Sequence, residues 1–125
     1  MKQIIKEVIK KLTCDYAEVR IEEKQITNVT FSGKEIEKVG TDFVFGGNIR
    51  VCDKGGWSFI SFNDLNQLEK VAFECIKMAK KIGTKKTILK KIPIINKTYK
   101  SKYKIDPRKI TLEEKEKLCR TANDF

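Results

Sequence analysis

Residues 46–83 read GGNIRVCDKGGWSFISFNDLNQLEKVAFECIKMAKKIG. Alternating apolar and polar side chains predict strands over 49–51 and 57–62, and the DKGG sequence at 53–56 predicts the hairpin connection between them. Asparagine and aspartate at 63–64 are good N-cap residues, and the glycine at the end of the stretch is placed to stop a helix. One helical face collects the apolar residues Leu65, Leu68, Val71, Ala72, Cys75, Ile76, Ala79 and Ile82. The stretch therefore predicts two antiparallel strands and an amphipathic helix that packs on them.

The residues before this stretch extend the same pattern. Apolar residues at helical spacing predict a short amphipathic helix over 2–12. Residues 16–31 are extended in character, a turn signal follows at 32–34, and strand-forming residues occupy 36–45. Gly46-Gly47 is expected to break or bulge the strand. The predicted fold class is α+β, with an antiparallel sheet of about four strands and helices packed on one face.

The chain is predicted to have three parts. Residues 1–83 form the α+β domain, and residues 84–105 form a lysine-rich connector with at most one irregular or edge strand around 98–105. Thr111 and Glu114 make a capping box that opens a helix. Residues 106–125 are therefore expected to start a second domain, whose helix is truncated in this sequence, so we expect a piece of a longer protein.

The positive charge is concentrated in one segment. The chain has 27 basic and 17 acidic residues, for a net charge of +10, and residues 76–110 hold 13 of the basic residues with Asp106 as their single acid. Such a segment is typical of a solvated connector. The alternative is a nucleic-acid-binding module that uses residues 76–110, with Tyr99 and Tyr103 as a stacking strip between lysines. Because 23 of the 27 basic residues are lysine, bidentate phosphate or base recognition by arginine is scarce, and we expect nucleic acid not to be the partner.

The composition excludes several kinds of chemistry. The chain has no histidine, so a serine-histidine-aspartate triad, a cysteine-histidine pair and a histidine-ligated zinc site are all excluded within it. Glu18 and Glu22 share a predicted strand face, and Asp15 with Glu22 and Glu23 is at most a weak site for a hard cation. The paired glycines at 46–47 and 55–56 match no phosphate-binding fingerprint. We predict no catalytic, cofactor-binding or metal-binding residue here, and no enzyme activity of this chain alone.

The cysteines and the amino terminus bear on the compartment. Cys14, Cys52, Cys75 and Cys119 lie far apart, which predicts reduced structural thiols, with Cys75 buried on a helix. Charged residues interrupt the apolar residues at the amino terminus, and no apolar run is long enough for a membrane span. We expect a cytoplasmic protein with no membrane contact.

A succession of short segments resembles the amino-terminal domain of the TldD/PmbA family. These segments are DYAEVRIE at 15–22, GKE at 33–35, GGNIRV at 46–51, GWSF at 56–59 and NDL at 63–65. Asp106-Pro107 and the TLEEK sequence at 111–115 resemble the start of that family's second domain. The resemblance covers residues 14–83 well and residues 106–119 moderately.

The resemblance implies a metal-dependent peptidase system, in some members linked to maturation of a peptide antibiotic or removal of an antitoxin, with an older label as modulator of DNA gyrase. Family members are several hundred residues long and dimeric, and their zinc is held by an H-E-x-x-x-H helix in the carboxy-terminal region. None of those ligands has a counterpart in this chain, so zinc is expected only in the missing region of a full-length parent.

The implied role is that of a non-catalytic amino-terminal domain or fragment. It would pack beside the peptidase domain of the same or a homologous chain, help to form a dimer, and help to enclose a chamber for unfolded peptides. Exposed strand edges would suit peptide capture by strand addition. We also predict that Trp57 and Phe59 pack in the core of the domain. A small interaction domain that pairs with a longer homologue is a further alternative.

Overall fold

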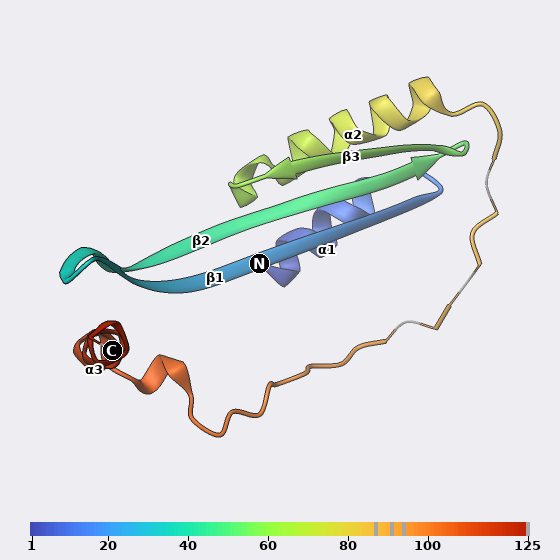
Figure 1. Ribbon diagram of the computed structural model, residues 1–125. Helices are drawn as coiled ribbons and strands as arrows, with labels where there is room; N and C mark the ends of the chain where they lie inside the picture. The colour runs from blue at the N-terminus through green and yellow to red at the C-terminus, as the bar shows by residue number, and fades with distance from the viewer. Residues whose placement is uncertain (87, 91, 94, 125) are drawn as a thin grey trace. The chain divides into compact units, whose positions relative to one another are not determined.

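The computed structural model describes residues 1–86, 88–90, 92–93 and 95–124. Along the chain the elements are α1 (Lys2–Lys11), β1 (Tyr16–Ser32), β2 (Glu35–Asp53), β3 (Gly56–Phe62), the 3-10 turn η1 (Leu65–Gln67), α2 (Leu68–Ile82), the 3-10 turn η2 (Pro107–Lys109) and α3 (Leu112–Asn123) (Figure 1). The chain falls into two compact units. The first contains residues 1–24 and 45–91, and the second contains residues 25–44 and 92–125.

The sheet has three strands in the order β1-β2-β3. β2 and β3 pair antiparallel from Gly47 opposite Phe62 to Asp53 opposite Gly56. Lys54 and Gly55 form the tight turn between these strands and have φ angles of 49° and 79°. Two successive residues with positive φ are typical of the turn whose twist matches that of a hairpin.

The prediction of about four strands is wrong by one, because the glycine pair at 46–47 does not interrupt β2. The strand runs unbroken from Glu35 to Asp53. A Cβ atom on Gly47 would lie 2.5 Å from the ring of Phe62 and 3.0 Å from the carbonyl oxygen of Arg20. This glycine therefore makes room for a core side chain inside a continuous strand.

The core lies between the sheet and two helices on one of its faces. Val8 of α1, Ile49 and Val51 of β2, Phe62 of β3 and the apolar face of α2 form one buried cluster. The cluster contains the α2 residues Leu68, Val71, Ala72, Cys75, Ile76 and Ala79. Figure 1 shows α1 and α2 along the sheet on this side. The predicted α+β class, with helices on one face, is confirmed.

The prediction that Trp57 and Phe59 are core residues is wrong. Trp57 is 40% exposed and Phe59 is 55% exposed, whereas Ser58 between them is buried. α2 approaches β3 so closely that a Cβ atom on Gly56 would collide with the carbonyl oxygen of Ala79. Gly56 and Ser58 therefore face the helix at this end of β3, and the alternation of the strand places the two aromatic residues on the other face.

The predicted helix boundaries are largely confirmed. Gly83 follows the last residue of α2. The capping box of α3 is present, since the Glu114 amide donates to Thr111 Oγ1 at 3.2 Å and the Thr111 amide donates to Glu114 Oε2 at 2.9 Å. Residues 98–105 form neither helix nor strand, so the edge strand considered there is wrong. Among the described residues, every helix is too short or too polar to cross a membrane.

Candidate functional surface

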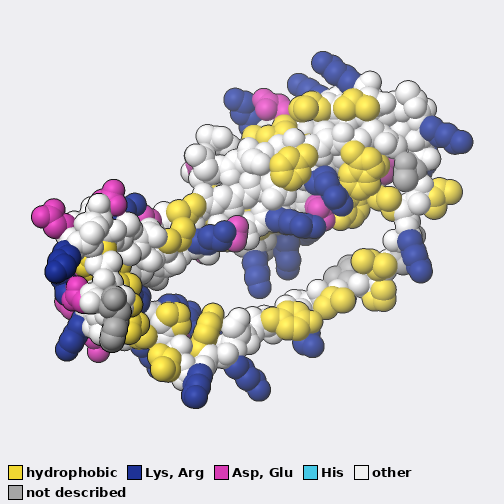
Figure 2. All heavy atoms as spheres, in the orientation of Figure 1, with side chains coloured by type: hydrophobic (Ala, Val, Ile, Leu, Met, Phe, Trp, Pro, Cys, Tyr) yellow, Lys and Arg dark blue, Asp and Glu magenta, His cyan; other side chains and the backbone are white. Residues whose placement is uncertain are grey.

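The sheet face opposite α1 and α2 carries a cluster of aromatic and charged side chains. We call it the open face and define it by Tyr16, Glu18, Arg20, Arg50, Trp57 and Phe59. Figure 2 shows hydrophobic side chains gathered over β3, with basic and acidic side chains beside them over the sheet. All three strands of the first unit contribute to this surface, which makes it the main candidate functional surface of the described residues.

Trp57 is the centre of the aromatic part of the open face. Its ring lies 5.8 Å from that of Tyr16, centroid to centroid, with 58° between the planes. The Arg50 guanidinium lies 4.7 Å from the Trp57 ring centroid on the neighbouring strand. Both geometries are favourable for aromatic pairing and for cation-π attraction. The indole is thus held in one orientation while part of it stays in contact with water.

Glu18 organises the charged part of the open face. The Tyr16 hydroxyl donates to Glu18 Oε2 at 2.8 Å, and Arg50 Nε lies 3.1 Å from Glu18 Oε1. Arg20 also approaches Glu18 Oε1, at 3.4 Å. The Tyr16 hydrogen bond, more than any other contact, lowers the pKa of Glu18, and the same bond raises the pKa of Tyr16. A carboxylate held ionised in this way is unsuited to proton donation near neutral pH.

The other carboxylates considered from the sequence are not brought together. Glu22 pairs with Lys24 at 2.9 Å, and Asp15 accepts a hydrogen bond from the Lys54 amide at 2.9 Å. Over the described ranges, no group of three or more histidine, cysteine, aspartate or glutamate residues could hold a metal ion. The residues present therefore do not fit the zinc centre that the TldD/PmbA resemblance implies for a full-length parent.

The cysteines are unpaired, and Cys75 is buried on α2, as predicted. All four cysteines are free, and Cys52 and Cys75 are buried. Ser58 Oγ donates to the Cys75 carbonyl oxygen at 2.6 Å and lies 2.9 Å from Cys75 Sγ, which links β3 to α2. Burial raises the pKa of Cys14, so this thiol is a weaker nucleophile than a free cysteine near neutral pH.

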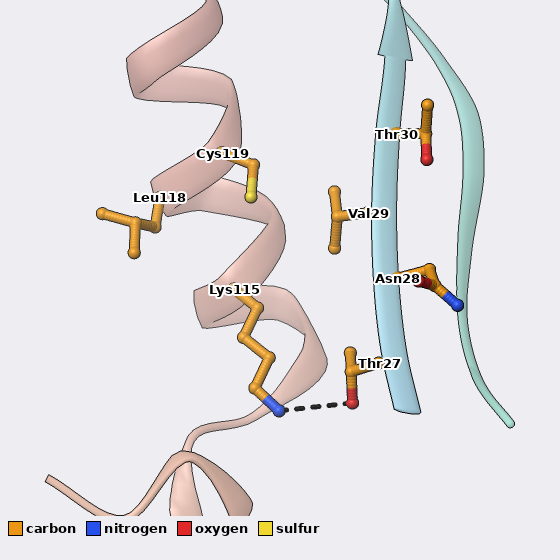
Figure 3. Close-up of a pocket in the computed structure, with 7 residues that line it drawn as sticks. All are labelled: Thr27, Asn28, Val29, Thr30, Lys115, Leu118 and Cys119. Carbon is orange, nitrogen blue, oxygen red and sulfur yellow. Dashed lines mark hydrogen bonds between the residues drawn. The ribbon is translucent and has the colours of Figure 1, made fainter. Parts of the chain in front are cut away.

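A pocket of about 340 Å³ lies within the second unit, between β1 and α3. Its lining residues are Thr27, Asn28, Val29, Thr30, Lys115, Leu118 and Cys119. Figure 3 shows Lys115 and Cys119 directed toward β1, where Lys115 Nζ donates to Thr27 Oγ1 at 3.4 Å, and Leu118 directed away. The sequence holds no local signal for this pocket, because its two walls come from distant parts of the chain.

In the basic segment, residues 76–110, the rings of Tyr99 and Tyr103 each lie close to a basic side chain of the same segment. Lys97 Nζ lies 4.9 Å from the Tyr99 ring centroid, and the Arg108 guanidinium lies 5.8 Å from that of Tyr103. Arg108 also pairs with Asp106 at 2.7 Å, and its hydrogen bonds lower the pKa of that carboxyl to about 2. Both tyrosine rings and the Asp106 carboxylate thus have partners within the basic segment itself.

The sequence predicts only part of the arrangement of the open face. The alternation of residues in β1 predicts that Tyr16, Glu18 and Arg20 lie on one side of the strand. The position of Arg50 between Glu18 and Trp57 depends on how three strands align, so it required the structure. None of the open-face residues was predicted as a site.

Comparison with known proteins adds a family. Residues 17–82 match a family described as PmbA/TldA metallopeptidase domain 1. Metalloprotease slr0863 of Synechocystis sp. is 34% identical over 112 residues, which cover 89% of this chain and 24% of that protein. Metalloprotease MJ0996 of Methanocaldococcus jannaschii is 34% identical over 109 residues, which cover 83% of this chain and 24% of that protein. The chain spans about a quarter of the length of these curated relatives. No solved structure matches it.

Proposed function

Because this chain belongs to the PmbA/TldA metallopeptidase family, where it matches the first domain, we propose that it is a non-catalytic amino-terminal domain or fragment of a zinc metallopeptidase. In this role it helps to enclose the peptide chamber and to form the dimer. Its partners are the peptidase domain of the same or a homologous chain and an unfolded peptide, and its compartment is the cytoplasm.

The match over residues 17–82 carries this proposal, because those residues make up the sheet and α2. The two metalloproteases it resembles are about four times as long as the matched part, which leaves most of each protein for a catalytic region. In this chain a carboxylate network on the sheet ties Glu18 to a tyrosine and two arginines. Such a network holds side chains in place and leaves proton transfer and metal binding to other parts of the protein.

The outer edge of β3 suits the handling of an extended peptide. β3 ends the strand order of the described sheet, so its outward backbone groups have no strand partner there. An extended chain can add to such an edge through main-chain hydrogen bonds, with little dependence on its sequence. Unfolded peptides offer these groups and folded proteins do not, which would give the selectivity expected of a chamber wall.

A domain replacement in the Synechocystis metalloprotease tests the proposal. In this fusion protein, our chain replaces the matched quarter of the relative, and cleavage of an unfolded peptide is measured with zinc present. We expect the fusion protein to cleave the peptide and the relative without that quarter to be inactive. An inactive fusion protein that remains folded and binds zinc as the intact relative does would contradict the proposal.

A nucleic-acid-binding module is the second candidate, and the exposure of Tyr99, at 77%, within the basic segment favours it. Binding of this kind would depend on phosphate neutralisation and fall steeply as salt is raised. Deletion of residues 84–104 should abolish any such binding. If the intact chain binds neither DNA nor RNA at low salt, this candidate is excluded.

A further inference from the structure

We propose that the open face docks onto the part of a full-length family member that lies outside the region matched by this chain, through a segment that offers an apolar side chain and a carboxylate. This inference rests on the proposed function and adds the surface by which the domain would be held. Two properties of the open face support it, one apolar and one electrostatic.

The apolar property is the exposure of neighbouring aromatic residues. Trp57 and Phe59 are two residues apart on one strand, so they lie on the same face, and both keep a large exposed fraction. The uncovered face of an antiparallel sheet normally carries polar side chains. Rigid aromatic side chains at the centre of a surface are instead typical of interfaces, where they supply contact area at little cost in conformational entropy.

The electrostatic property is an excess of positive charge beside the aromatic residues. Arg20 and Arg50 share the single carboxylate of Glu18, so the trio carries one uncompensated positive charge. The Arg20 side chain is 70% exposed and has room for another acceptor. A carboxylate from the partner would complete the pairing, and an arginine-carboxylate contact becomes stronger when the interface excludes water.

Two partners could cover the open face: a second copy of this chain, or the remainder of a full-length protein. The charge favours the remainder of the protein. Two copies joined through their open faces would bring together surfaces of the same net sign, which opposes association. In the relatives the remainder of the protein is about three times as long as the matched part, because the matched part is 24% of each. A contact between domains of one chain needs only about 600–1,500 Å² of buried surface, an area that a small sheet face can contribute to.

Hydroxyl-radical footprinting of the fusion protein tests this inference. Oxidation of Trp57 and Phe59 is compared between the 125-residue chain and the fusion protein, with Phe73 as the internal control because it is 42% exposed on α2. We expect oxidation of the two open-face residues to fall by roughly fivefold or more in the fusion protein, because the core of an interface loses contact with water. Oxidation of Phe73 should stay within about twofold of its value in the chain alone, because Phe73 lies outside the proposed interface.

Charge reversal gives a second test in the same fusion protein. Arg20→Glu should restore oxidation of Trp57, whereas Lys77→Glu, the matched change on α2, should not. Equal oxidation of Trp57 and Phe59 in the chain and the fusion protein overturns the inference. Protection that appears in the chain alone as its concentration rises also overturns it, since a second copy would then be the occupant.

Peptide cleavage by the fusion protein separates the two proposals. Cleavage without protection of the open face overturns the docking inference and leaves the proposed function standing. In a fusion protein that is folded and binds zinc as the intact relative does, protection without cleavage overturns the proposed function and supports the docking surface. Loss of both in such a fusion protein overturns both.

Discussion

Glu18 is the residue whose surroundings define the open face. One carboxylate accepts from a tyrosine on its own strand and pairs with an arginine on the next, so it aligns β1 with β2. Its pKa in the folded protein lies below the ordinary value of 4.5. The resulting stabilisation is complete above that ordinary value and is lost as the pH falls through the folded pKa.

Tyr16→Phe tests this linkage. The substitution removes the largest cause of the lowered pKa, so the pKa of Glu18 should rise toward 4.5, and the loss of stability on acidification should become smaller. An NMR titration of the Glu18 carboxyl carbon and urea unfolding at neutral and acidic pH measure both effects. Tyr99→Phe, which removes a hydroxyl from the connector, is the control. An unchanged Glu18 titration in Tyr16→Phe would refute the assignment.

Trp57→Ala measures how much the half-exposed indole contributes to the fold. Loss of one aromatic pair and one cation-π contact should lower the free energy of unfolding by about 1–2 kcal/mol. Leu68→Ala, at a fully buried position, should lower it by about 2–5 kcal/mol. Chemical denaturation of the two variants gives the comparison. A larger loss for Trp57→Ala would place Trp57 back in the core.

At the scale of elements, the closeness of α2 to β3 determines which side chains β3 buries. Hydrophobic preference favours burial of Trp57 and Phe59, but the register opposite Ile49 and Val51 directs Ser58 to the core instead. A one-residue change of register would exchange the two faces. Sequence patterns reveal that β3 alternates, whereas packing against a helix selects the face that is buried.

The neighbouring glycines of β2 provide a matched test of this close packing. Gly47→Ala places a methyl group against the Phe62 ring, and such overpacking should lower the free energy of unfolding by about 1–3 kcal/mol. A Cβ atom on Gly46 would come no closer than 3.9 Å to the carbonyl oxygen of Phe62. Gly46→Ala should therefore be neutral or slightly stabilising. Equal melting temperatures for the two variants would contradict the role given to Gly47.

At the scale of the whole molecule, the net charge and the fold belong to different parts of the chain. The excess of basic over acidic residues lies in 76–110, largely outside the core cluster, so the net charge describes the connector more than the domain. The prediction of a domain over 1–83 and a connector over 84–105 stays a prediction. The second unit combines residues 25–44 with residues 92–125. The sequence patterns do not predict this grouping, because the two segments are far apart in the chain.

Limited trypsin digestion tests the connector. The lysines within 84–105 lie outside regular secondary structure in the described residues and should be cut first. Lysines of α2 such as Lys77 and Lys80 should resist, because the helix is anchored by its buried face. Mass spectrometry of the early fragments identifies the sites. Early cleavage within α2 at the same rate would contradict the assignment.

The sequence predicts these helices and strands because periodicity depends only on residues that are close together in the chain. Helical spacing of apolar residues predicted α1 and α2, the capping box predicted the start of α3, and alternation predicted β3. Continuity of β2 through its glycine pair, exposure of Trp57 and the convergence of Arg50 on Glu18 depend on contacts between residues far apart in the chain. Those contacts arise only when strands align and helices pack, so they became visible only in the folded molecule.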